Sequence, residues 1–256
     1  TKGSIVEFPR ISGLRVTRPA ASGAMIDTDG DGEGDVEIPS KGKITPVRFT
    51  IGEGSEKREY AILTRFGIQQ DTYQTLQVNL AATDEQATVY YLSAASIVGD
   101  LDGTKVRVID DNLDGVYGSP PQTYGHIGMS KDHFQAELDT FVVGSEKRAR
   151  PWSEYVQVGK QWYRLEVEDN GTRISATPTT LKTGKIKLKS KGPKPTWVVL
   201  QGEGSYENTF FDIASGKAIE VPVGRYSLVY GDVRKGKGVQ TMKAVIVPGQ
   251  QTRNWR

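Results

Sequence analysis

An acidic loop near the N-terminus holds the residues best suited to chemistry. It runs from Asp27 to Asp35, with carboxylates at loop positions 1, 3, 5 and 9 and a glycine at position 6. This spacing matches the first half of an EF-hand loop, where alternate side chains and a backbone carbonyl at position 7 wrap a hard cation. We therefore predict a Ca²⁺ site whose ligands are Asp27, Asp29, Asp31, the carbonyl of Glu33, and Asp35.

Position 12 departs from the EF-hand pattern. An EF-hand loop carries a bidentate glutamate there, but this chain has Ile38, and no flanking helices are evident. Glu37 or a distant carboxylate must complete the shell, and we predict Glu37 as a ligand. The alternative interpretation is an acidic turn that is only solvated. If calcium does bind, it acts as a structural clip and not as a sensor that moves helices.

A second loop has the same spacing of oxygen-bearing side chains but fewer charged residues. Asp110, Asn112 and Asp114 occupy positions 1, 3 and 5, Gly115 follows at position 6, and Val116 offers its carbonyl at position 7. We predict weaker calcium binding here, because position 12 is a proline and a remote acid must finish the shell. The candidates for that acid are Asp100, Asp102, Asp132 and Asp139. A glycine-capped hairpin turn is the alternative.

Three parts of the chain resemble known groups of proteins. The first loop resembles the Asp-x-Asp-x-Asp-Gly-x-x-Asp repeats of thrombospondin type 3 and related bacterial surface proteins. The stretch Val106–Leu188 resembles uncharacterised exported bacterial proteins, through the second loop and segments like Val158–Leu165 and Thr183–Leu188. The stretch Val221–Val229 looks like the prealbumin-like modules appended to surface proteins and carboxypeptidases. These resemblances imply an extracellular or periplasmic setting and binding or spacer modules.

Short β-rich segments must position these loops. Alternating or β-branched runs recur along the chain and are separated by turn residues, whereas helical periodicity is scarce. The clearest hairpin joins 162–168 to 172–176 through Asn170-Gly171, which suits a tight turn. Only Ser130–Leu138 could form a helix, and its pattern also fits a strand. We predict an all-β protein of two to three β-sandwich domains, Ig-like or prealbumin-like.

Charge and turn composition suggest the domain boundaries. Residues 1–181 carry 19 Lys/Arg against 26 Asp/Glu, a net −7, and residues 182–256 carry 14 against 5, a net +9. We predict an N-terminal domain over 1–96, a middle domain over 97–181 and a basic C-terminal domain over 182–256. The alternating lysines from Lys185 to Lys191 indicate a strand with one solvated face, and we expect no nucleic acid partner.

Several functional classes lack their residues. The chain has no cysteine, and its two histidines, His126 and His133, are outside any His-Glu-x-x-His arrangement, so a zinc hydrolase lacks its ligands. No Gly-x-Ser-x-Gly elbow or phosphate-binding glycine loop in a strand-to-helix setting appears. No apolar run approaches the roughly 20 residues of a membrane-spanning helix. We expect no catalytic activity and no transmembrane segment.

These observations favour a calcium-stabilised structural or cell-surface protein, secreted or periplasmic. The opposite charges of the two parts suggest that copies associate head to tail into a filament. Copies of the chain or other surface proteins are the expected partners. The alternatives are a carbohydrate-binding module, because four tryptophans and eleven tyrosines could contact a glycan, and a non-catalytic accessory domain of an exported enzyme.

Overall fold

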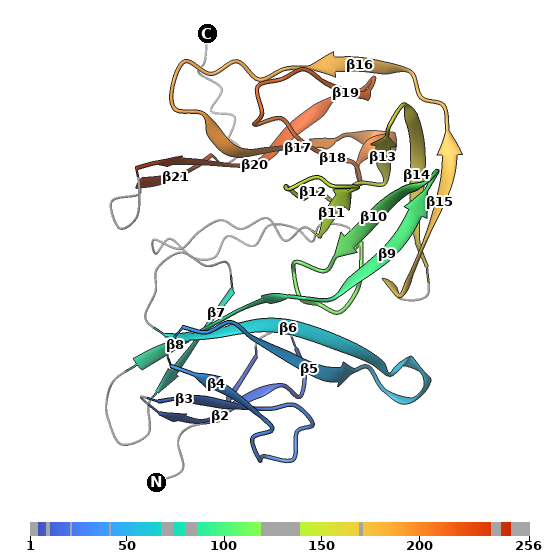
Figure 1. Cartoon of the computed structure of the whole chain (residues 1–256). Helices are drawn as coiled ribbons and strands as arrows, with labels where there is room; N and C mark the ends of the chain where they lie inside the picture. The colour runs from blue at the N-terminus through green and yellow to red at the C-terminus, as the bar shows by residue number, and fades with distance from the viewer. Residues whose placement is uncertain are drawn as a thin grey trace. The chain divides into compact units, whose positions relative to one another are not determined.

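A computed structural model describes most of the chain as antiparallel β-sheets (Figure 1). The described residues are 5–8, 11–20, 22–40, 42–67, 74–79, 86–118, 139–168, 171–236 and 242–246. They contain strands and two short 3₁₀ turns, Gly54–Glu56 and Gly204–Tyr206, but no α-helix. The all-β prediction is confirmed. The segment Ser130–Leu138, both histidines and Asp132 lie outside the described residues.

The strands divide into two compact units. The first comprises residues 1–96 and 109–116, and the second comprises residues 97–108 and 117–256. The second acidic loop therefore belongs to the first unit, although the sequence suggests the middle domain. The reason is its bonding to a strand of the first unit, since the Tyr60 hydroxyl donates to Asp110 and the Arg58 guanidinium donates to the Gly115 carbonyl.

The first unit is built from two four-stranded sheets. One has the order β1-β2-β3-β4, with bounds Val6–Glu7, Arg15–Ala20, Gly23–Asp27 and Val36–Pro39. The other has the order β5-β6-β8-β7, with bounds Thr45–Ile51, Arg58–Gly67, Gln86–Ser93 and Gln74–Asn79. Strands β3 and β4 contact β6, and the core is formed by residues that lose all exposure: Val16, Ile26, Ile38, Val47, Ile62 and Val89. Alternate side chains of two facing sheets pack together, as in a β-sandwich.

The second unit contains four sheets of two to four strands. The order β12-β11-β10-β9 has bounds Arg150–Pro151, Thr140–Val143, Thr104–Ile109 and Ser96–Leu101, and the order β13-β14-β15 has bounds Tyr155–Val158, Gln161–Glu168 and Arg173–Thr179. A two-stranded sheet pairs β16 (Thr183–Ile186) with β19 (Ile219–Pro222). The order β18-β17-β20-β21 has bounds Phe210–Asp212, Pro195–Gly202, Tyr226–Lys235 and Met242–Ile246.

The predicted hairpin is present in the second unit. Strands β14 and β15 pair antiparallel from Trp162 opposite Thr179 to Glu168 opposite Arg173. Gly171 has a φ of +79°, the positive φ that a tight turn between two strands asks of a glycine. No helix among the described residues combines the length and hydropathy needed to cross a membrane.

We predict that Gly34→Ala destabilises the first unit by about 1–3 kcal/mol, because overpacking a filled site forces neighbours to move. A Cβ at Gly34 would lie 2.4 Å from Met25 Cβ and 3.0 Å from Thr17 Oγ1. The matched control is Gly99→Ala, whose Cβ would meet nothing closer than Val106 Cγ2 at 3.6 Å. Urea denaturation measures both, and an equal effect of the two substitutions would contradict the prediction.

Candidate metal centre and a polar cavity

Strands β3 and β4 hold the first acidic loop between them. Strand β3 ends at Asp27, β4 begins at Val36, and the last pair of the ladder joins Ile26 to Val36. The Asp35 amide also donates to the Ile26 carbonyl over 2.8 Å. The two ends of the loop are therefore fastened to adjacent strands of one sheet, which limits how far the carboxylates can move apart.

Asp27 is the buried centre of this loop. It has no exposed surface, and its carboxylate accepts hydrogen bonds from the amides of Gly30 at 2.7 Å and Gly32 at 3.0 Å. Gly30 and Gly32 have φ values of +83° and +89°, a region that costs little only for glycine. The glycines thus turn the backbone so that its N–H groups satisfy a charge removed from water.

The other acids of the loop are held by hydrogen bonds within the loop. The Asp31 amide donates to Asp29 Oδ1 at 3.2 Å, and the Glu33 amide donates to Asp31 Oδ1 at 2.7 Å. Both the hydroxyl and the amide of Thr28 donate to Asp35 Oδ2, at 2.6 and 2.7 Å. These bonds, the hydroxyl first, lower the pKa of Asp35, so that its carboxylate stays charged.

Three of the predicted ligands converge. Asp27, Asp29 and Asp35 each offer one carboxylate oxygen, and these oxygens lie within 4.8 Å of one another. Such a group could hold a metal ion, and all-oxygen ligands suit a hard cation such as Ca²⁺. Asp31 and Glu37 are not members of this group. Together with the Glu33 carbonyl, they stay predicted ligands.

The packing explains why position 12 is not a glutamate. Ile38 lies on β4 opposite Ala24 and has no exposed surface. Its side chain is part of the core of the first unit, where an unpaired carboxylate would be expensive. Glu37, one residue earlier, is on the opposite face of the strand and is exposed. The fold thus uses position 12 for packing and leaves the shell to other oxygens.

The second loop has the same internal geometry as the first. Gly115, with a φ of +81°, donates its amide to the buried Asp110 at 2.8 Å, as Gly32 does to Asp27. The Asp114 amide donates to Asn112 Oδ1 at 3.0 Å, and the Val116 amide donates to Asp114 Oδ1 at 2.8 Å. In both loops, therefore, positions 1, 3 and 5 accept hydrogen bonds from the amides of positions 6, 5 and 7, respectively.

Asp110 differs from Asp27 in its surroundings. The Tyr60 hydroxyl donates to it at 2.6 Å, while burial raises its pKa to about 6. A buried carboxylate that is charged only at some cost is stabilised by a nearby cation. Leu113, whose side chain is buried, is held at a φ of +61°, so this loop also stores backbone strain.

The remote acids that could complete the calcium shell of the second loop already have hydrogen-bond partners of their own. Asp139 is fully buried and accepts the Gly118 amide at 2.5 Å, and Asp100 accepts the Gly103 amide at 2.7 Å. Asp102 accepts a hydrogen bond from the Tyr163 hydroxyl. All three belong to the second unit. Calcium at the second loop, with Asp110, Asn112, Asp114 and Val116 as ligands, stays a prediction.

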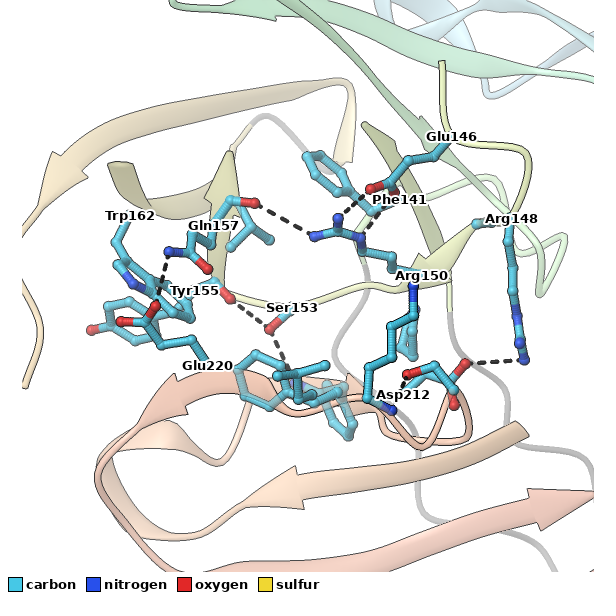
Figure 2. Close-up of a pocket in the computed structure, with 18 of the residues that line it drawn as sticks. Phe141, Glu146, Arg148, Arg150, Ser153, Tyr155, Gln157, Trp162, Asp212 and Glu220 are labelled. Carbon is cyan, nitrogen blue, oxygen red and sulfur yellow. Dashed lines mark hydrogen bonds and ion pairs between the residues drawn. The ribbon is translucent and has the colours of Figure 1, made fainter. Parts of the chain in front are cut away.

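The second unit also contains a cavity of about 670 Å³ (Figure 2). Its wall includes side chains from β11 to β14, β18 and β19. Arg150 bonds Glu146 and reaches the Gln157 carbonyl at 3.5 Å, the Gln157 amide donates to Glu220 at 3.4 Å, and Arg148 pairs with Asp212 at 3.0 Å. Trp162 also lines this cavity, and its indole N–H is buried and has no hydrogen-bond partner.

The sequence did not reveal the residues that donate hydrogen bonds to the acidic side chains of the two loops and the cavity. Thr28 follows Asp27 directly and could have been suspected as a donor, because hydroxyls next to acidic turns often bond locally. Tyr60 and Asp110 are 50 residues apart, and Gln157 and Glu220 are 63 apart. No spacing in the chain signals such pairs, since only the sheets bring them together.

We predict that Asp29→Asn weakens calcium binding at least about 10-fold, equivalent to about 1.4 kcal/mol. Asparagine keeps the acceptor for the Asp31 amide but removes one of the three converging charges. The control is Glu33→Gln, which removes one charge from the same loop at a residue whose backbone carbonyl, and not its carboxylate, is a predicted ligand. We expect it to change the affinity less than about 3-fold. Calorimetric titration measures both, and the reverse order would refute the assignment of Asp29.

Comparisons with known proteins leave the geometry as the main guide to function. No protein family model, no curated protein and no solved structure matches the chain.

Proposed function

We propose that the chain is a calcium-stabilised structural or cell-surface protein that works outside the cell or in the periplasm. The observation that carries this proposal is the convergence of Asp27, Asp29 and Asp35 on one point. Three negative charges in so small a space repel one another, and a divalent cation removes that repulsion. The cation would fasten β3 to β4 at the open end of their ladder.

The limited ligand set supports an extracellular setting. Three carboxylates and a carbonyl leave part of a shell of about six to eight oxygens to water or other groups. Sites with fewer charged ligands bind calcium weakly, with Kd values of about 10⁻⁴–10⁻³ M in extracellular modules. A site of this kind fills only where free calcium is abundant, as it is outside cells.

A structural role agrees with the position of the loop. Both ends continue into strands of a packed sheet, and Ile38 anchors β4 in the core. A sensor of the EF-hand type moves a helix pair, whereas here the elements on either side of the loop are β3 and β4. Filling the site would therefore stiffen the loop instead of moving a domain.

Thermal melting of the full chain tests this proposal. We expect 2 mM calcium to raise the Tm relative to EGTA, because a ligand that binds only the folded state stabilises it by about 1.4 kcal/mol at tenfold its Kd. For a domain of about 100 residues, this corresponds to a shift of roughly 5–10 °C. Magnesium should shift the Tm less, since it prefers about six ligands in a smaller and stricter octahedron.

The variant Asp29→Asn is the control in this melt. Its Tm in EGTA should equal or exceed that of the wild type, because one repulsive charge is gone, and its calcium response should be largely lost. A wild-type Tm that is the same in EGTA and calcium would overturn the proposal.

Glycan binding is a second candidate, favoured by the cavity of the second unit. The amide of Gln157 and the carboxylate of Glu220 offer a donor and an acceptor there. Partly exposed aromatic rings of Tyr155 and Phe211 lie beside them. The volume is within the range of about 300–1,000 Å³ that is usual for small-ligand sites.

A glycan array followed by calorimetry tests this second candidate. We expect Gln157→Ala to weaken the best-binding sugar about 10-fold, because one hydrogen-bonding group to a buried ligand is lost. The control is Gln201→Ala, whose amide donates to the Glu207 carbonyl and does not line the cavity. Absence of any binding sugar, or equal effects of both variants, would contradict glycan binding in this cavity.

A further inference from the structure

A ladder of lysines marks one surface of the second unit. It consists of Lys182, Lys185, Lys187, Lys189, Lys191 and Lys194, and all six are exposed. The stretch 182–194 contains no aspartate or glutamate. The ladder therefore concentrates six positive charges in thirteen residues, in a chain whose overall net charge is only +2.

The fold holds these charges at regular intervals. Strand β16 pairs with β19, and the half-buried Ile186 and Leu188 pack against a core of Val198, Ile213 and Ala214. Exposure alternates as far as Lys189, so that Lys185, Lys187 and Lys189 point to solvent. Alternate residues of an extended chain are about 6.6 Å apart, so the backbone presents these three ammonium groups along a line before it bends at residues 191–193.

No ion pair compensates the charges of these lysines, a property they share with the other lysines in the described part of the chain, so it is their density that sets them apart. Among the described residues, no carboxylate forms an ion pair with any of the six. Arginines of the same unit behave differently: Arg148, Arg150, Arg164, Arg173, Arg225 and Arg234 each pair with a carboxylate. Glu220 is opposite Lys185 in the sheet, but its carboxylate accepts bonds from Thr183 and Gln157.

Protection of a sheet edge explains only part of the ladder. A lysine on an edge strand discourages pairing with another chain, which suits Lys185. Strand β16 ends at Ile186, however, and the ladder continues to Lys194. Beyond Ile186 the chain is not a strand and has no unpaired strand edge to protect. Edge protection therefore does not explain the lysines that follow.

We propose that the lysine ladder binds a linear anionic polysaccharide, recognised through sulfate or carboxylate groups along its length. A polymer with repeated charges gains affinity from each lysine by releasing bound counterions. Protein interfaces are depleted in lysine, which argues against a protein partner. The stretch 182–194 also has no aromatic residue and no arginine, so it lacks the side chains that stack on bases or grip them bidentately.

The experiment measures binding of the full chain to dextran sulfate and to polygalacturonate at several salt concentrations. The test variant is Lys187→Gln/Lys189→Gln/Lys191→Gln, and the control is Lys105→Gln/Lys160→Gln/Lys235→Gln, which removes three exposed charges elsewhere in the same unit and away from the cavity. We expect the test variant to bind at least about 10-fold more weakly at 0.1 M salt. Its plot of log K against log salt should be shallower by about 2, at about 0.7 per lost contact. The control should change affinity less than about 3-fold.

The other outcomes overturn the proposal. If the wild type binds neither polymer, or both triple variants lose affinity equally, the ladder is not the site. Single-stranded DNA of equal charge serves as a competitor. If it displaces the bound polysaccharide as effectively as free polysaccharide does, the partner is not specifically a glycan. If sedimentation shows that the test variant abolishes self-association while polymer binding is intact, the occupant is another copy. Unchanged melting curves would show that the variants fold.

Discussion

Two aspartates without contact to water determine how the loops of the first unit are built. Asp27 ends β3 and Asp110 follows β10, and both are fully buried. A buried carboxylate must be hydrogen-bonded or neutralised. In each loop the amide of the glycine five residues later satisfies it, and this requires a positive φ at that glycine. The backbone of each acidic loop is thus folded so that its amides donate hydrogen bonds to one buried carboxylate.

The two loops solve the remaining charge problem in different ways. Around Asp27 two further carboxylates converge, which increases the negative charge and makes a cation the natural partner. Around Asp110 there is an asparagine at position 3, and a tyrosine from β6 donates to the carboxylate. The second loop therefore gathers less negative charge than the first, although burial still raises the pKa of Asp110 to about 6.

Positive charges follow a similar division in the second unit. Arginines bond to nearby carboxylates and carbonyls, and Arg148 also stacks over Trp197 at 4.5 Å, uses that suit a planar and weakly hydrated guanidinium. The lysines from 182 to 194 remain in water without carboxylate partners among the described residues. The paired arginines therefore join segments within the unit, whereas the side chains of these lysines are exposed.

The sequence by itself determined the fold class and the position of the acidic cluster that could hold a metal ion. Alternating apolar residues and turn glycines indicated the strands, and acids at alternate positions indicated the loop, because both signals depend on residues that are neighbours in the chain. Tertiary structure decided which acids converge, because the register of β3 with β4 brings Asp35 back to Asp27. It also decided that Ile38 belongs to the core, that Tyr60 supports Asp110, and that Gln157 meets Glu220 across the cavity. Contacts of this kind join residues far apart in sequence, and only sheet pairing and packing define them.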